Sequence, residues 1–286
     1  MILGVGTVAL DSVETPTASC RDVPGGSALY FAAAASTVCP VAIVGVTGED
    51  FPAEPLDRLA ARGVDVSGIL RLPHPTFRWH ARYDESGDRE VLSVHRGDIV
   101  RAAPVVPPPL RRPEILFLGS AHPSVQHRVL DQAETDGLVV LDTMPTWIRE
   151  GTRDLGQIFS RTDVLLANDA EIRVLTGLPD EAEAAEALRS MGPRWVVVKR
   201  GARGAGAYGE GERVEVNGVR VENVVDPTGA GDAFAGGLVA SLVGTRSPSA
   251  AEMHAALEVG AAMGARAVSA FSFEGLLVPE PPVRRP

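Results

Sequence analysis

Short apolar runs alternate with amphipathic helical patterns along most of this 286-residue chain. A short run that is apolar throughout is typical of a strand covered on both faces, because a half-exposed strand alternates apolar and polar residues. The predicted strands are residues 41–46, 115–118, 138–141, 164–166 and 195–199, and the predicted helices between them are residues 56–62, 124–135, 170–175 and 181–191. The alternation predicts an α/β fold whose mostly parallel sheet carries helices on both faces. The carboxyl ends of its strands would then meet at one edge, where ligands usually bind.

The segment 77–84 differs from this pattern, because apolar or aromatic residues alternate with polar ones in an almost strict period of two. One face carries Phe77, Trp79, Ala81 and Tyr83, and the other carries Arg78, His80, Arg82 and Asp84. Turn residues 85–88 and a second strand-like stretch at 91–94 follow, so the pattern predicts an antiparallel hairpin. A flap with one aromatic face needs something to cover, and the sequence leaves three candidates open: a core, a partner chain or a substrate.

Composition and charge argue against two classes of function. At 45% hydrophobic residues the chain can bury one large core, and its net charge of −10 is unfavourable for a dedicated nucleic-acid binder. Its two cysteines, Cys20 and Cys39, form no CxxC motif, which fits a reducing compartment. The first residues lack the features of a signal peptide, and no apolar run is long enough for a membrane span. We therefore expect a cytoplasmic protein with neither a nucleic-acid nor a membrane partner.

Residues 226–237 read DPTGAGDAFAGG and lead into an apolar helix that is expected to start near Asp232. The start of a helix leaves backbone N–H groups without partners, and glycine lets a ligand approach them, so this segment predicts an anion site. A carboxylate among such amides is useful when it takes a proton from a nucleophile that attacks the bound anion. Asp232 is therefore the predicted general base, and Gly229, Ala230 and Gly231 the predicted amide donors. The alternative is an ordinary loop in which Asp232 is the N-cap of the helix.

The same segment resembles the C-terminal signature of the ribokinase-like (PfkB) family of sugar and nucleoside kinases. The resemblance implies a three-layer α/β/α sandwich with a small β-sheet lid. The lid would comprise residues 10–23 and 73–100, and the main domain residues 1–9, 24–72 and 101–286. It also implies ATP- and Mg²⁺-dependent transfer of a phosphoryl group to a hydroxymethyl group of a sugar or nucleoside, and a homodimer formed through the lid.

Two further segments match nucleotide-binding parts of that family. Asn168 and Glu171 correspond to an N-x-x-E motif beside the magnesium and the phosphates, with Glu171 holding Mg²⁺ through water. The alternative for this pair is a capping box at a helix start. The second segment, residues 199–204, resembles the family segment that approaches the phosphates and the ribose; its predicted nucleotide-binding residues are Lys199, Arg200, Gly201 and Gly204. The alternative is a basic turn in solvent.

The acceptor site is predicted from positions near the N-terminus and in the lid. Asp11 would bind adjacent hydroxyl groups, because a carboxylate accepts two hydrogen bonds at once, and Gly25 and Gly26 would let the backbone approach the acceptor. Tyr30 stands where the family often has Asn, which argues against simple ribose or fructose specificity. With Trp79 it could stack on a nucleobase, which favours a nucleoside, although these rings would equally suit a lid core or a dimer interface.

Asp226 and Thr228 match family positions that help to hold a monovalent cation, so K⁺ is predicted there. Asp142, at the end of a predicted strand, is expected at the ligand edge. Two alternatives to a kinase remain. A non-catalytic sugar or nucleotide sensor would have little need for Asp232, Asn168 and Glu171 together. A dinucleotide-binding oxidoreductase is suggested by the glycines of residues 4–6, but the third glycine of that motif is missing.

Overall fold

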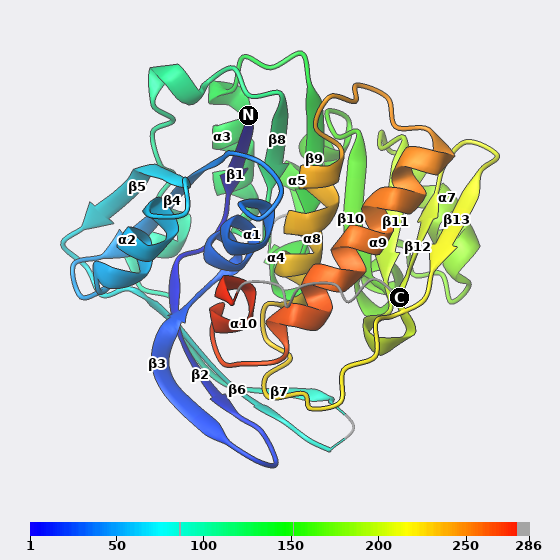
Figure 1. The fold of residues 1–286 in the computed structure, drawn as a ribbon. Coiled ribbons are helices and arrows are strands. Elements are labelled where there is room, and N and C mark those ends of the chain that lie inside the picture. Colours follow the sequence, from blue (N-terminus) through cyan, green and yellow to red (C-terminus); the bar gives the residue numbers. More distant parts are fainter. Residues whose placement is uncertain (86, 151, 279–286) are drawn as a thin grey trace, which may run out of the picture.

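The computed structural model describes residues 1–85, 87–150 and 152–278. Within these residues the main sheet has nine strands in the order β13-β12-β11-β10-β9-β8-β1-β4-β5 (Figure 1). Their bounds are β1 Ile2–Val5, β4 Val41–Gly48, β5 Asp65–Leu72, β8 Ile115–Leu118, β9 Leu138–Asp142, β10 Val164–Asn168, β11 Trp195–Lys199, β12 Ala205–Tyr208 and β13 Arg213–Val216. The strands from β5 to β11 pair in parallel, whereas β12 and β13 add an antiparallel edge. The predicted α/β class with a mostly parallel sheet is therefore confirmed.

Helices cover both faces of this sheet and give the three layers seen in Figure 1. On one face α1 (Ser27–Ala35), α8 (Ala230–Ser241) and α9 (Ala250–Ala267) form one core with alternate side chains of the strands. On the other face a second core is built by α3 (Pro123–Gln132), α4 (Pro145–Glu150), α5 (Thr152–Phe159), α6 (Asp169–Thr176) and α7 (Glu181–Arg189). The remaining α-helices of the described residues are α2 (Glu54–Ala60) and α10 (Glu274–Leu277), and three 3₁₀ helices lie at Asp98–Arg101, Pro108–Leu110 and Gly201–Arg203. Strands buried on both sides explain why the apolar runs show no alternation.

A separate four-stranded sheet, in the order β3-β2-β6-β7, projects from the main domain (Figure 1). It consists of β2 (Ala9–Glu14), β3 (Ser19–Gly25), β6 (Phe77–Tyr83) and β7 (Arg89–His95). β6 and β7 form the predicted antiparallel hairpin, and β2 runs parallel to β6. The sheet therefore joins the two segments that were predicted to form the lid, although it also takes in Ala9 and residues 24–25, which were assigned to the main domain.

The aromatic face of this lid packs inward. Trp79 and Tyr83 are each only 7% exposed, and they form a small core with Val13, Ala81 and Phe271, the last of which comes from the segment between α9 and α10. Of the three candidates for what this face covers, the structure supports a core between lid and main domain. The predicted homodimer through the lid stays a prediction. Within the described ranges, no helix is both long and apolar enough to cross a membrane.

Candidate active site

The glycine-rich segment forms the start of α8, at the edge of the molecule to which the lid is attached. The helix begins at Ala230, and its N-cap is Gly229, whose φ of +75° lies in the left-handed region. No side chain caps this helix, so Asp232 is not the N-cap but stands in the first turn. The capping alternative for Asp232 is therefore wrong. A side chain at position 229 would also overlap the ring of Tyr30, so both the backbone angle and the packing require glycine there.

Asp232 is partly buried, and its environment weakens its acidity. Burial raises its pKa to about 7, the carboxylates of Asp142 and Glu171 add to the rise, and the charges of Lys199 and Arg89 oppose it. A carboxylate with a pKa near neutrality is a suitable general base, since it accepts a proton readily and is still ionised at the working pH.

Asp11 lies close to Asp232. It is 4% exposed, and its Oδ2 accepts a hydrogen bond of 3.3 Å from the backbone N–H of Gly26. Burial raises the pKa of Asp11 to about 7; the bond from Gly26 lowers it, and the charges of Asp226 and Asp232 raise it further. A Cβ at Gly25 would overlap the Asp11 carboxylate, so glycine is required for this contact. The structure thus brings together Asp11, Gly25 and Gly26, three residues that were predicted to bind the acceptor.

Asn168 and Glu171 form a complete capping box at the start of α6. The Asn168 Oδ1 accepts bonds from the N–H groups of Ala170 and Glu171 at 3.0 and 2.8 Å, and the Glu171 carboxylate accepts both the Asn168 N–H and the Asn168 Nδ2–H at 2.9 Å. The capping alternative is therefore confirmed. It does not remove Glu171 from the site, because burial raises the pKa of that carboxyl to about 7, as is common for functional groups.

Three neighbouring strands end in polar residues at one edge of the sheet: Asp142 in β9, Asn168 in β10 and Lys199 in β11. The Lys199 Nζ donates to both carboxylate oxygens of Asp142 at 2.8 Å. Although burial lowers the pKa of Lys199, the charges of Asp142 and Glu171 more than offset this and keep the ammonium charged. A Cβ on Gly231 would lie 3.3 Å from Nζ, so this cation stands directly beside the start of α8.

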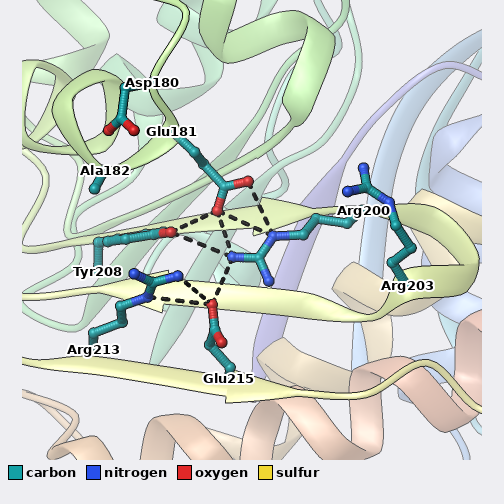
Figure 2. A pocket seen from close by; sticks show the side chains of 8 residues that line it. All are labelled: Asp180, Glu181, Ala182, Arg200, Arg203, Tyr208, Arg213 and Glu215. Carbon is teal, nitrogen blue, oxygen red and sulfur yellow. Dashed lines mark hydrogen bonds and ion pairs between the residues drawn. The ribbon is translucent and has the colours of Figure 1, made fainter.

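Arg200, the next residue, lies in a different place. Its guanidinium donates to the Glu181 carboxylate, to Glu215 at 2.9 Å and to the Tyr208 hydroxyl at 3.3 Å (Figure 2). These groups line a pocket of about 300 Å³ beside the antiparallel edge of the sheet, together with Arg203 and Arg213. The cause is the alternation of side chains along an extended backbone, which turns residues 199 and 200 to opposite sides. The structure therefore separates two residues that were both predicted to bind the nucleotide. Gly201 and Gly204, with φ of +58° and +92°, shape the turn that follows.

Tyr30 is also placed differently from the prediction. Its side chain is 1% exposed, its ring packs beneath Gly229, and it meets Phe273 edge-on with ring centroids 6.4 Å apart. Burial, together with the nearby charges of Asp11, Asp226 and Asp232, raises the pKa of Tyr30 well above its ordinary value. The ring supports the loop at the start of α8 and offers no open face on which a nucleobase could stack. The predicted stacking role of Tyr30 is therefore corrected to a packing role.

Asp226 and Thr228 connect the loop to the lid. The buried Asp226 carboxylate accepts the Thr228 N–H at 2.8 Å, and the Thr228 Oγ1–H donates to the Tyr83 hydroxyl at 3.2 Å. Arg89, which was not predicted, lies on the same side of the lid, with its Cζ 5.6 Å from the centre of the Trp79 ring. Its only sequence signal was its place directly after the hairpin turn. The lid thus contacts the segment that starts α8.

Within the described ranges, no group of three or more His, Cys, Asp and Glu side chains is arranged to hold a metal ion by itself. The donors at the sheet edge are the carboxylates of Asp142 and Glu171, next to Lys199. Together with the free N-terminus of α8, they make a site with closely spaced carboxylates, one buried cation and a positive helix end. Such a site suits the positioning of a phosphorylated ligand and the removal of a proton from a hydroxyl group.

The fold and this site define a phosphotransferase with an alcohol group as acceptor. Comparison with known proteins gives the family: residues 10–275 match the pfkB family carbohydrate kinases, and the chain belongs to this family of sugar and nucleoside kinases. It is 31% identical over 242 residues to a cytidine kinase of Thermococcus kodakarensis, across 82% of this chain and 86% of the relative. It is 30% identical over 232 residues to an ATP-dependent ribose-1-phosphate kinase of Halopiger xanaduensis, across 80% and 76% of the two chains.

Solved structures support the same fold. An E. coli protein provisionally called Ribokinase II superposes with a TM-score of 0.80 at 24% identity, over 96% of this chain and 95% of the other. That protein has also been solved with ATP and Mg²⁺, which supports the use of ATP and Mg²⁺ by the family. The predicted three-layer ribokinase-like architecture with a small sheet is therefore confirmed.

Proposed function

We propose that this protein transfers the γ-phosphoryl group of ATP to a hydroxymethyl group of a nucleoside, with Asp232 as the general base. The observation that carries the proposal is the place of Asp232: in the first turn of an uncapped, glycine-initiated helix, close to Asp11, with a pKa of about 7. A base of this kind at a helix start that no side chain caps fits attack of a hydroxyl group on a bound phosphoryl group.

In the proposed reaction, Asp11 and the backbone at Gly25 and Gly26 hold the hydroxyl groups of the acceptor. The attacking hydroxyl gives its proton to the Asp232 carboxylate while its oxygen forms a bond to the γ-phosphorus. The bond from that phosphorus to the bridging oxygen breaks, and ADP leaves with the electron pair. The amides of Gly229, Ala230 and Gly231 are expected to bind the charge on the transferring group, with Lys199 beside them.

The oxygen-only donor set of Asp142 and Glu171 fits Mg²⁺, which prefers oxygen ligands and keeps much of its water. When bound, the ion neutralises charge on the β- and γ-phosphates. Asp226, with its carboxylate buried next to Thr228, fits the predicted K⁺ site in the same way, since it offers oxygen donors. In this assignment Arg200 is left out, because its charge is already matched by Glu181 and Glu215.

A nucleoside is favoured over a simple sugar because the relative that is 31% identical over most of both chains is a cytidine kinase. Cytidine is therefore the first acceptor to test, and ribose 1-phosphate the second.

The test is ADP release from MgATP with cytidine, other nucleosides, ribose and ribose 1-phosphate, with and without the Asp232→Asn substitution. We expect acceptor-dependent ADP formation in the wild type and a loss of about 1000-fold in kcat in the variant, with MgATP binding changed by less than about threefold. Asp57→Asn is the matched control, because Asp57 is also in the first turn of a helix but is exposed. Turnover near the wild-type rate in Asp232→Asn would show that Asp232 is not the base. Absence of turnover with every acceptor would favour the non-catalytic sensor.

A further inference from the structure

Three buried ring nitrogens have no hydrogen-bond partner among the residues that the structure describes: Trp79 Nε1, His122 Nε2 and Trp147 Nε1. Their side chains are only 7%, 2% and 4% exposed. A buried polar group without a partner costs free energy, because it has lost its bonds to water and gained none in return. Each such group therefore needs a reason, and these three lie on segments that meet around one place.

The lid contributes one side of this place. Trp79 is the direct partner of Asp11 in the register of β6 and β2, so the two side chains share the inner face of the lid sheet. Just after β7 ends, the Arg96 guanidinium lies 5.0 Å from the centre of the Trp147 ring in α4, and it donates to the Glu150 carboxylate at 2.5 Å. The lid thus reaches from the predicted acceptor site to Trp147.

The main domain contributes the other side. Ser27 directly follows the glycine whose N–H binds Asp11, and its Oγ–H donates to the Ser120 carbonyl at 2.8 Å. His122 is two residues further on, and its ring meets the Trp147 ring edge-on with centroids 5.7 Å apart. These contacts form a ring around the predicted acceptor site, and the pair of His122 and Trp147 completes it within the main domain.

Both members of this pair present neutral donors. The His122 Nδ1 accepts the Ser124 N–H at 3.2 Å, so the proton of the neutral imidazole is on Nε2. Burial, together with the charge of Arg101, lowers the pKa of His122 and keeps the ring neutral at pH 7. The indole of Trp147 is a donor only, and the guanidinium over it already has its carboxylate. Two neutral donors fit a neutral group with two acceptors better than they fit a phosphate.

We propose that the N–H groups of His122 and Trp147 select the acceptor by its base: they donate to O2 and N3 of cytosine, two adjacent acceptors on one edge of that ring. Uracil carries an N–H at position 3, which would face a donor, so this pair discriminates cytidine from uridine. The cavity beside the pair measures only about 30 Å³ and is lined by Phe77 and Ala121, so the base enters as the lid opens. This role rests on the proposed kinase reaction and deepens it by naming the base.

The experiment compares Trp147→Phe and His122→Asn with the control Trp195→Phe. Phenylalanine keeps a ring but lacks the N–H, and asparagine can still cap α3 but is too short to replace Nε2. Each variant should raise the KM for cytidine about 10- to 100-fold, with kcat and MgATP binding within about threefold of the wild type.

The control separates a ligand contact from a structural one. The Trp195 Nε1–H is buried as well, but it donates to the Pro248 carbonyl at 3.0 Å. Trp195→Phe should therefore keep the wild-type KM for cytidine and lower the midpoint of thermal unfolding by about 2–4 °C. Trp147→Phe should unfold within about 2 °C of the wild type, since its N–H has no partner to lose among the described residues.

Analogues of the acceptor test the same contacts in the wild type. The ribonucleoside of pyrimidin-2-one keeps O2 and N3 but lacks the amino group, and its kcat/KM should be within about threefold of that of cytidine. Uridine and 3-deazacytidine, which lack the acceptor at position 3, should be at least about 10-fold poorer, and Trp147→Phe and His122→Asn should reduce this difference.

The outcomes distinguish this role from the kinase reaction itself. An unchanged KM for cytidine in both site variants, or equal use of cytidine and 3-deazacytidine, would overturn the role of His122 and Trp147 and leave the reaction in place. A preference for ribose 1-phosphate over cytidine would overturn it as well. A wild type that phosphorylates no acceptor would overturn the proposed function together with this role.

Discussion

Two charged regions lie on either side of strand β11. The pKa values of their carboxyl groups are raised in one region and lowered in the other. At the edge where the strands end, Asp11, Glu171 and Asp232 are held with pKa values of about 7, because burial is not offset by enough positive charge. In the pocket of Figure 2, Glu181 and Glu215 meet the guanidinium groups of Arg200 and Arg213. Burial raises the pKa of Glu181, but its bonds to Arg200 and Tyr208 outweigh this, and the bonds to Arg213 and Arg200 lower that of Glu215.

The difference shows which region is built for a ligand. In the pocket each carboxylate already has its cation, so a ligand would have to break ion pairs to bind there. At the sheet edge the carboxylates outnumber the cations, and this imbalance makes the protein less stable than neutral side chains would. Such a cost is typical of a functional site, where the missing charge is supplied by the ligand or by a moving part of the protein.

The largest expected effect is on kcat/KM for MgATP, and it distinguishes Lys199 from Arg200. These two residues are neighbours in the sequence but lie in different charged regions. Lys199→Met should lower kcat/KM for MgATP about 100- to 1000-fold, because it removes the buried cation beside Gly231. Arg200→Met should change it by less than about threefold, because its partners are Glu181 and Glu215. Steady-state kinetics with varied MgATP measures kcat/KM for both variants. Comparable losses in both variants would mean that the pocket also contributes to nucleotide binding.

The next effect concerns pH. Asp232 has to be ionised to act as a base, and its pKa is about 7, so kcat/KM should fall at least tenfold for each pH unit below about 6.5. Because the neighbouring carboxyls of Asp11 and Glu171 also have pKa values of about 7, the apparent value belongs to the cluster. The profile is measured at constant ionic strength between pH 5 and 9. An acid limb centred near pH 4 would show that these carboxyls behave as exposed groups do.

Much of the fold could be predicted from the sequence, because the pattern is local. Fully apolar runs at 115–118, 138–141 and 195–198 indicate strands covered on both faces, and parallel strands bring their carboxyl ends to one edge. That rule alone places Asp142, Asn168 and Lys199 together. The antiparallel strands β12 and β13 were not predicted, since AGAY and RVEV are short and carry little apolar signal.

The side-chain partners could not be read from the sequence, because they depend on which segments meet in space. Arg200 is matched by Glu215, whose strand was not predicted, and by Glu181 from α7. Tyr30 has the right place in the sequence for an acceptor contact, but Gly229 and Phe273 cover its ring. Arg89 has no motif around it, and its place beside Tyr83 and Trp79 follows only from the strand register.

A third prediction tests whether the ion pairs of the pocket stabilise the protein. Arg200→Met leaves the partly buried Glu181 without its main cation and should lower the free energy of unfolding by about 1–2 kcal/mol. Arg203→Met is the control, because Arg203 and its partner Asp169 are both on the surface, and it should change this free energy by less than about 0.5 kcal/mol. Urea unfolding at pH 7 measures both. Equal stability of the two variants would mean that the pocket charges are not structural.

The smallest expected effect is also on the free energy of unfolding. Removing a charge at the sheet edge should raise this free energy, whereas removing one in the pocket should lower it. The pKa of Asp11 is about 7 in the folded protein against 3.8 for a free side chain, so folding takes up a proton between these values and stability falls as pH rises toward 8. Asp11→Asn should therefore raise the free energy of unfolding at pH 8 by about 1 kcal/mol or more, and by less at pH 5, where Asp11 is neutral in the folded protein and ionised only in the unfolded chain.

The matched control is Asp50→Asn, near the base of the lid. Burial raises the pKa of Asp50, but its bonds from Thr76 and Arg78 outweigh this, so its charged form stabilises the fold above its ordinary pKa. Asp50→Asn should thus lower stability at pH 8, whereas Asp11→Asn raises it. Thermal unfolding of both variants at pH 5 and pH 8 separates the two cases. If Asp11→Asn were instead destabilising at pH 8, the Asp11 charge would be compensated within the free protein, and the contrast between an unbalanced ligand site and a balanced structural pocket would not hold.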